Sequence, residues 1–154
     1  MDQMTSYEAL VFPSDDRPPH LVALVSTPIT PVPNPPEPYR CARLPHPQVY
    51  MDYVADEPGA WRFHLVEALD GMKRKFDTPY IIFYPVISRD SMPFPINKCI
   101  REIQGNFYKE SRAWRGNIVV AKYKDQQYSA MIDMSMADFP LVKNYLQSHY
   151  TPST

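Results

Sequence analysis

Glycine is scarce in this sequence, with four residues among 154. Loops that wrap the phosphates of a nucleotide need several glycines at fixed spacing, and neither G-x-G-x-x-G nor GK[ST] occurs. A phosphate-binding loop of either kind is therefore excluded. We also find no spacing typical of a nucleophile elbow, and we assign no catalytic residue.

Cysteine is equally limited, because Cys41 and Cys99 are the two in the chain. They lie far apart in unlike surroundings and do not indicate a disulfide framework. The pair His64 and Glu67 would supply two metal ligands on a helix, but no third ligand is spaced to complete a zinc site. We therefore expect neither a metal nor a cofactor. No signal-peptide pattern follows Met1, which favours reduced thiols in an intracellular protein, cytoplasmic or nuclear.

Long apolar runs and net charge are also lacking. The longest apolar run, residues 80–87, is interrupted by Pro85 and is too short to cross a bilayer, so we expect no membrane partner. The net charge is −1, which argues against nucleic-acid binding by overall electrostatics. A hydrophobic content of 44% still suffices for an ordinary core.

Proline, in contrast, is abundant at 18 residues, and eight of them fall in residues 28–47. Because proline fixes φ and lacks an N–H, this segment is predicted to be extended and solvated, outside sheets and helices. It is either a spacer that wraps the domain or a ligand for an aromatic groove. In the second interpretation Pro35, Pro38 and Arg40 form a PxxPxR motif.

Residues 1–47 as a whole are interpreted as an N-terminal arm. Its apolar runs at 7–12 and 21–25 can pair as a hairpin and contribute edge strands, or they can remain a flexible arm with two apolar patches. Residues 48–150 are predicted to form the globular domain, followed by a frayed tail at 151–154.

Residues 113–134 predict a β-hairpin, since β-branched and aromatic residues at 118–123 precede a polar turn and a second alternating segment. Residues 80–84 predict a buried strand. Helices are predicted for 61–76, 96–103 and 138–149 from their apolar stripes, although Trp61, Phe63 and Leu65 also alternate as in a strand. The predicted fold is α+β, with a small, mainly antiparallel sheet packed against about three helices.

Residues 98–124 hold seven basic residues interleaved with Phe107, Tyr108, Trp114 and Tyr123. This mixture is typical of single-stranded nucleic-acid binding. However, the outer faces of helices and hairpins are routinely basic, and acidic residues of the arm can cover the patch in cis. Nucleic acid is therefore the less favoured partner.

Two further hypotheses concern particular side chains. His64 and Cys99 would form a reactive thiolate pair in an enzyme if the fold brought them together. Trp114 and Arg115 would anchor an interface at the end of the hairpin, unless Trp114 only fills the core. We prefer a non-enzymatic protein-interaction module of unknown pathway, with a protein partner, to an enzyme.

Three segments carry a resemblance, namely FPINKCIREIQG at 94–105, AWRGNIVVAKY at 113–123 and MADFPLVKNYL at 136–146. Within residues 80–146 the chain resembles uncharacterised small proteins of filamentous and mushroom-forming fungi. The resemblance implies an intracellular fungal protein with an ordered core, and it carries over no activity or site residues. The proline-rich segment lies outside it.

Overall fold

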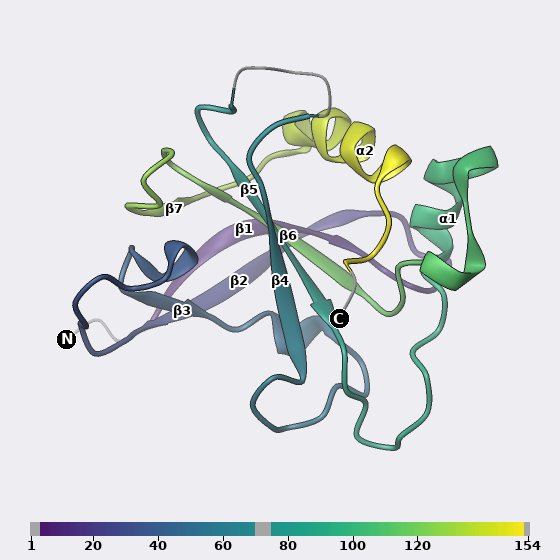
Figure 1. Ribbon diagram of the computed structural model, residues 1–154, viewed down its shortest axis with the longest axis horizontal. Helices are drawn as coiled ribbons and strands as arrows, with labels where there is room; N and C mark the ends of the chain where they lie inside the picture. Colours follow the sequence, from purple (N-terminus) through teal and green to yellow (C-terminus); the bar gives the residue numbers. More distant parts are fainter. Residues whose placement is uncertain (1–3, 70–74, 153–154) are drawn as a thin grey trace.

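The computed structural model describes residues 4–69 and 75–152 and shows an antiparallel, curled sheet accompanied by two α-helices (Figure 1). The strands follow the spatial order β3-β2-β1-β6-β5-β4, and β7 pairs with β6 beside this path. Their bounds are β1 (Thr5–Phe12), β2 (His20–Pro28), β3 (Arg43–Pro45), β4 (Trp61–Val66), β5 (Tyr80–Pro85), β6 (Ile118–Tyr123) and β7 (Met131–Ile132). The helices are α1 (Lys98–Gln104) and α2 (Phe139–Ser148), and no helix among the described residues is long and apolar enough to span a membrane.

The predicted α+β class is confirmed, but with two α-helices in the described residues rather than about three. The error lies at residues 61–76, where the helical stripe and the alternation of Trp61, Phe63 and Leu65 compete. Residues 61–66 form β4, because alternation places these three apolar side chains against one core while Arg62 is exposed. The rest of that stripe includes residues 70–74, which lie outside the described residues.

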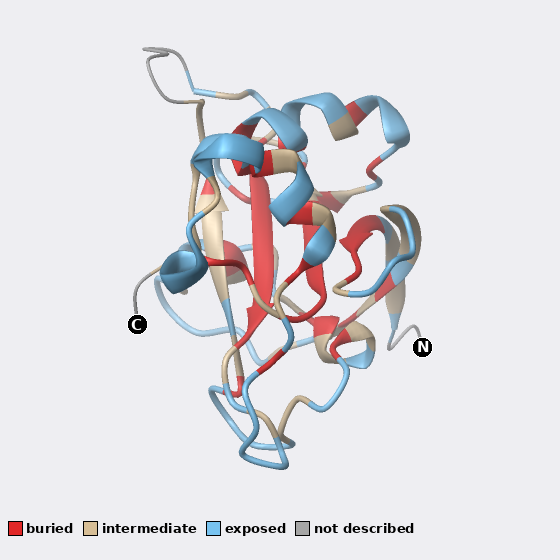
Figure 2. Ribbon diagram, turned by 90° about the vertical axis from the view of Figure 1, so that its right-hand side faces the viewer, coloured by how far each residue is buried: buried red, intermediate tan, exposed pale blue. Residues whose placement is uncertain are grey.

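The two faces of the sheet bury separate cores. On one face, Leu10, Ile82 and Val120 pack with Ile100 of α1 and Leu146 of α2. The other face carries a second cluster, which includes Ala9, Val11, Phe83, Val119 and Tyr123. Burial on both faces explains why the interior strands are almost continuously apolar (Figure 2).

The N-terminal hairpin forms as predicted, with Leu10 opposite Leu21. However, β1 also pairs with β6, since Leu10 lies opposite Val120, so β1 is an interior strand rather than an edge strand. Leu10 and Phe12 are fully buried.

The proline-rich segment does not stay outside secondary structure. Residues 37–39 form a 3₁₀ turn that contains the buried Pro38, and Pro45 ends the short strand β3. A proline is tolerated there because β3 is an edge strand with one side free of ladder hydrogen bonds.

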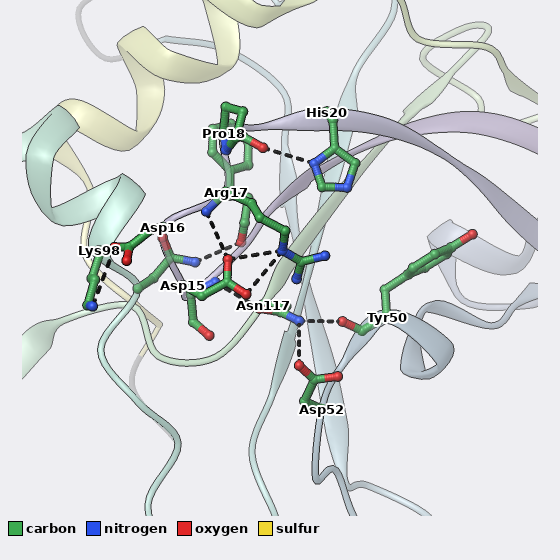
Figure 3. A network of polar contacts seen from close by, with 12 residues as sticks. Asp15, Asp16, Arg17, Pro18, His20, Tyr50, Asp52, Lys98 and Asn117 are labelled. Atoms are coloured by element: carbon green, nitrogen blue, oxygen red, sulfur yellow. Dashed lines mark hydrogen bonds and ion pairs between the residues drawn. The ribbon is translucent and has the colours of Figure 1, made fainter.

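The hairpin of β6 and β7 is confirmed, with Lys122 opposite Ile132 and Tyr123 opposite Met131. Asn117, just before β6, holds two loops together: its Oδ1 accepts from Ser14 N (2.8 Å) and its Nδ2 donates to Tyr50 O (2.8 Å) (Figure 3). Because Asn117 is buried, these bonds replace the solvent that its amide has lost.

Candidate functional site

A pocket of about 420 Å³ opens beside the C-terminal end of β5. Its walls come from three stretches that are distant in sequence, namely residues 84–86 with 92–94, residues 111–115, and residues 151–152. We call it the arginine pocket. Its lining residues are Tyr84, Pro85, Val86, Met92, Pro93, Phe94, Ser111, Arg112, Ala113, Arg115, Thr151 and Pro152.

A sharp turn at Gly116 places Arg115 in this pocket. Gly116 has φ +75°, its N–H donates to Pro95 O (2.7 Å), and a Cβ there would lie 2.6 Å from Pro85 Cγ. A side chain would thus be strained and would clash. The turn brings the guanidinium of Arg115 to Phe94, where Nη1 donates to the carbonyl oxygen (3.0 Å).

The C-terminal wall is held by hydrogen bonds to the chain that follows α2. The carbonyl of His149 accepts from Trp114 Nε1 (3.0 Å) and from Gln104 Nε2 (2.8 Å). Thr151 N then donates to Arg112 O (3.3 Å). Residues 149–152 are therefore attached to the segment that carries both arginines.

The pocket is cationic. Among the described residues, Arg112 and Arg115 are the charged residues of the lining, and none of the other described lining residues has a carboxylate. The guanidinium carbon of Arg112 lies 4.5 Å from the centre of the Tyr150 ring, which orients this side chain by a cation–π contact. Arg115 uses one of five N–H donors on Phe94 O and keeps donors for a ligand.

Tyr84 also lines the arginine pocket. Burial raises the pKa of this phenol, and the charge of Arg62 opposes the shift without cancelling it. Arg62 lies opposite Tyr84 on β4. The hydroxyl is therefore protonated at neutral pH, and it is a donor suited to an anionic oxygen.

The two residues predicted to anchor an interface, Trp114 and Arg115, have different environments in the structure. Trp114 is 2% exposed, and its ring packs edge-on against Tyr84 at a centroid distance of 6.0 Å. It occupies the core position considered as the alternative, because its indole N–H finds a partner inside the protein. Arg115, in contrast, lines the pocket.

The PxxPxR residues lie elsewhere. Pro38 is buried and its carbonyl accepts from Tyr123 Oη (2.8 Å), while Arg40 pairs with Glu37 (3.9 Å). Pro35 lines a separate hollow beside Tyr39. The 3₁₀ turn at residues 37–39 interrupts the extended conformation that a proline-groove ligand needs.

His64 and Cys99 do not share a site. His64 Nε2 lies 2.9 Å from Tyr145 Oη, and burial, followed by the charge of His149, lowers the His64 pKa. Burial raises the pKa of the Cys99 thiol, and Glu102 raises it further, which disfavours the thiolate. Cys99 is partly buried rather than fully buried. In the described part of the chain, no group of three or more potential ligand residues could hold a metal ion.

The basic and aromatic residues of 98–124 do not form a continuous stacking surface. Trp114 and Tyr123 are buried, whereas Phe107 is 59% exposed. Lys98 pairs with Asp16 of the N-terminal loop (3.5 Å), so an acidic residue of the arm does reach this region (Figure 3).

No protein-family model, curated protein or solved structure matches this chain. The fungal resemblance remains an expectation. Sequence reasoning identified Arg115 but missed Arg112, Tyr84 and the C-terminal wall. The run of basic residues was a signal for Arg112, whereas nothing local in the sequence indicates that residues 151–152 close the pocket.

Proposed function

We propose that this protein is a non-enzymatic, intracellular protein-interaction module whose arginine pocket receives an acidic segment of a partner protein. The observation that carries the proposal is a pocket whose described lining residues include two arginines and no carboxylate. Guanidinium groups bind carboxylates through paired, charge-assisted hydrogen bonds. Both cysteines are free thiols, which supports an intracellular location.

Charge complementarity is the reason for choosing an acidic partner. Phe94 and Met92 supply apolar surface beside the arginines. A peptide with glutamate or aspartate next to an apolar residue would therefore contact both kinds of surface. Arg115 is partly buried, so a salt bridge there is less screened by solvent than one at a fully exposed arginine.

The test uses a hexaglutamate amide labelled with fluorescein at its N-terminus, with binding followed by fluorescence anisotropy and by amide chemical shifts of the isotope-labelled protein. We expect saturable binding whose shifts concentrate at residues 111–115 and 151–152. Arg115→Ala should weaken it by about tenfold to a hundredfold, equivalent to one charge-assisted hydrogen bond. Arg101→Ala, which removes an exposed arginine of α1 outside the pocket, should change affinity less than twofold.

Equal affinity of the native protein, Arg112→Ala and Arg115→Ala would refute the arginine pocket as the binding site. Shifts scattered over exposed lysines would have the same meaning. Inorganic phosphate is compared with the peptide at the same total concentration of negative charge. If phosphate then reproduces all the shifts and displaces the peptide completely, the pocket binds small anions and the peptide proposal fails.

A further inference from the structure

One edge of the sheet carries backbone groups that have no hydrogen-bond partner among residues 4–69 and 75–152. Hydrogen-bonded pairs alternate along antiparallel strands. Val86 N donates to Ala60 O, so the hydrogen-bonded pairs of β4 with β5 recur at every second residue after Ala60, namely at Arg62, His64 and Val66. Tyr123 N donates to Pro79 O, which assigns the alternate residues of β5 to bonds with β6 and agrees with this pattern. The backbone groups of the residues between them, Trp61, Phe63 and Leu65, therefore point away from the sheet.

Among the described residues, those outward groups of 61, 63 and 65 have no hydrogen-bond partner. The same edge is closed one step further on, because Glu67 O accepts from Phe76 N (2.7 Å). The open stretch therefore has a defined end, and the distance along the strand from Trp61 to Leu65 is about 13 Å.

The two edges of the curled sheet differ in their protection. The β3 edge is three residues long and contains Pro45, which lacks an N–H, and Arg43 bonds to Ser26 there. The β4 edge is six residues long and contains no proline or lysine. Natural proteins usually block an exposed strand edge with such residues, so an unblocked edge is suited to pairing with another strand.

A cleft of about 530 Å³ lies where an added strand would run. It is lined by Leu44 of β3, by Trp61 and Phe63 of β4, and by Tyr39, whose ring meets that of Phe63 edge-on at 6.1 Å. The cleft therefore lies between the two edges of the sheet and has aromatic walls. Its charged lining residues are Glu57 and Arg62. Arg62 is exposed and forms no ion pair, with Glu57 or any other residue, in the described part of the chain.

We propose that the β4 edge takes up an extended segment of a partner protein as an additional antiparallel strand. The segment would alternate apolar and acidic residues. Its apolar residues would lie opposite Trp61, Phe63 and Leu65, and an acidic residue would lie opposite Arg62 on the other face. Main-chain hydrogen bonds supply affinity in this mode of recognition, and the alternating side chains supply specificity. This site is separate from the arginine pocket and does not depend on it.

Charge distinguishes such a partner from a second copy of this chain. Residues 61–66 contain Arg62 and His64 but no carboxylate. If two β4 strands paired with Phe63 opposite Phe63, Arg62 of one copy would face His64 of the other. Such a dimer provides no counter-charge for Arg62, whereas a partner strand with glutamate does.

The test uses a fluorescein-labelled peptide, Ser-Val-Glu-Val-Glu-Val-Ser amide, with the full-length protein. We expect saturable binding by anisotropy, with amide shifts concentrated at residues 61–65. In an antiparallel pair the residues opposite 61, 63 and 65 exchange hydrogen bonds with them. N-methylation of the valines should therefore reduce affinity at least about tenfold. N-methylation of the glutamates should leave it within about threefold.

Charge exchange provides the second arm. Arg62→Glu should weaken the glutamate peptide and strengthen its lysine counterpart, Ser-Val-Lys-Val-Lys-Val-Ser amide, whereas Arg115→Ala should leave both affinities unchanged. The proposal is overturned if the unmethylated peptide shows no saturable binding or if both methylation patterns have equal effects. It is also overturned if sedimentation shows a dimer that Phe63→Pro dissociates, since the β4 edge would then be occupied by a second copy.

Discussion

Trp114 belongs to the core, whereas its neighbours Ala113 and Arg115 line the arginine pocket. Its ring lies against Tyr84, and its indole N–H bonds to the carbonyl of His149, so a single side chain joins β5, the segment before β6 and the end of α2. Arg115, the next residue, faces the pocket. Neighbouring residues thus have opposite roles, because Gly116 turns the chain sharply just after them.

Mutation of these two neighbours should separate stability from binding. Trp114→Ala is expected to lower the free energy of unfolding by about 3–5 kcal/mol, the usual cost of removing a fully buried tryptophan. Arg115→Ala should cost about 1 kcal/mol, since it loses one hydrogen bond to Phe94. Urea denaturation measures both values. Near-native stability of Trp114→Ala would show that the indole is not part of the core.

At the scale of elements, a polar cluster fixes the start of α2 on the sheet. Asp138 Oδ1 accepts from Lys122 Nζ (2.8 Å) of β6 and from Tyr80 Oη (2.8 Å) of β5, while Oδ2 accepts from Ser135 N (2.9 Å). The sequence correctly places Asp138 at the helix start, but its side chain closes the preceding 3₁₀ turn with Ser135 rather than capping α2 itself.

This cluster predicts an acid-dependent loss of stability. Burial opposes ionisation of Asp138, but hydrogen bonds from Lys122, Ser135 and Tyr80 outweigh burial and hold its pKa below the usual value. The stability gained is fully present above the unfolded-state pKa of about 3.9 and is lost as pH falls through the lower folded-state value.

Asp138→Asn should therefore cost about 3–5 kcal/mol at pH 7, because the partly buried Lys122 loses its counter-charge. The variant should also lose less additional stability than the native protein between pH 5 and pH 2. Thermal unfolding over this pH range tests both statements, with Asp56→Asn in an exposed turn as the control. Parallel pH profiles of the native and Asp138→Asn proteins would contradict the assignment.

The sequence predicts some elements better than others. It predicts best those elements whose pattern is contained in a short segment, and worst those that depend on contacts with distant residues. The apolar run of β5 and the apolar stripe of α1 are local signals, and both elements are confirmed. In β4, helical and strand periods fit the same residues, and pairing with β5 decides between them. Pro38 is buried, and its carbonyl accepts a hydrogen bond from Tyr123, which is distant in sequence. The arginine pocket likewise depends on the docking of residues 151–152.

At the scale of the whole molecule, the position of β1 makes the N-terminal residues part of the sheet. β1 lies between β2 and β6, and its residues contribute to both cores. The sequence alone favours residues 48–150 as the globular unit. The sheet gives a reason to expect otherwise, since removal of residues 1–47 takes away three of its strands.

A protein that begins at Gln48 should therefore lose cooperative thermal unfolding, as followed by circular dichroism. Removal of β1 would expose Val119 and Val120 of β6, which are fully buried in the full-length protein. Full-length protein treated identically is the control. A sharp, cooperative transition in the shortened protein would show that residues 48–150 fold without the N-terminal strands.

The pairing of β1 with β6 also has a consequence during synthesis. Phe12 pairs with Ile118, more than a hundred residues later in the chain. At typical rates of translation the β1–β2 hairpin waits about 5–20 s on the ribosome before β6 is made. During that interval the edge of β1 that later binds β6 is open, and the apolar side chains of Leu10 and Phe12 lack their final neighbours. The nascent chain is therefore most exposed to misassociation at its beginning, and it is there that a holding chaperone would act.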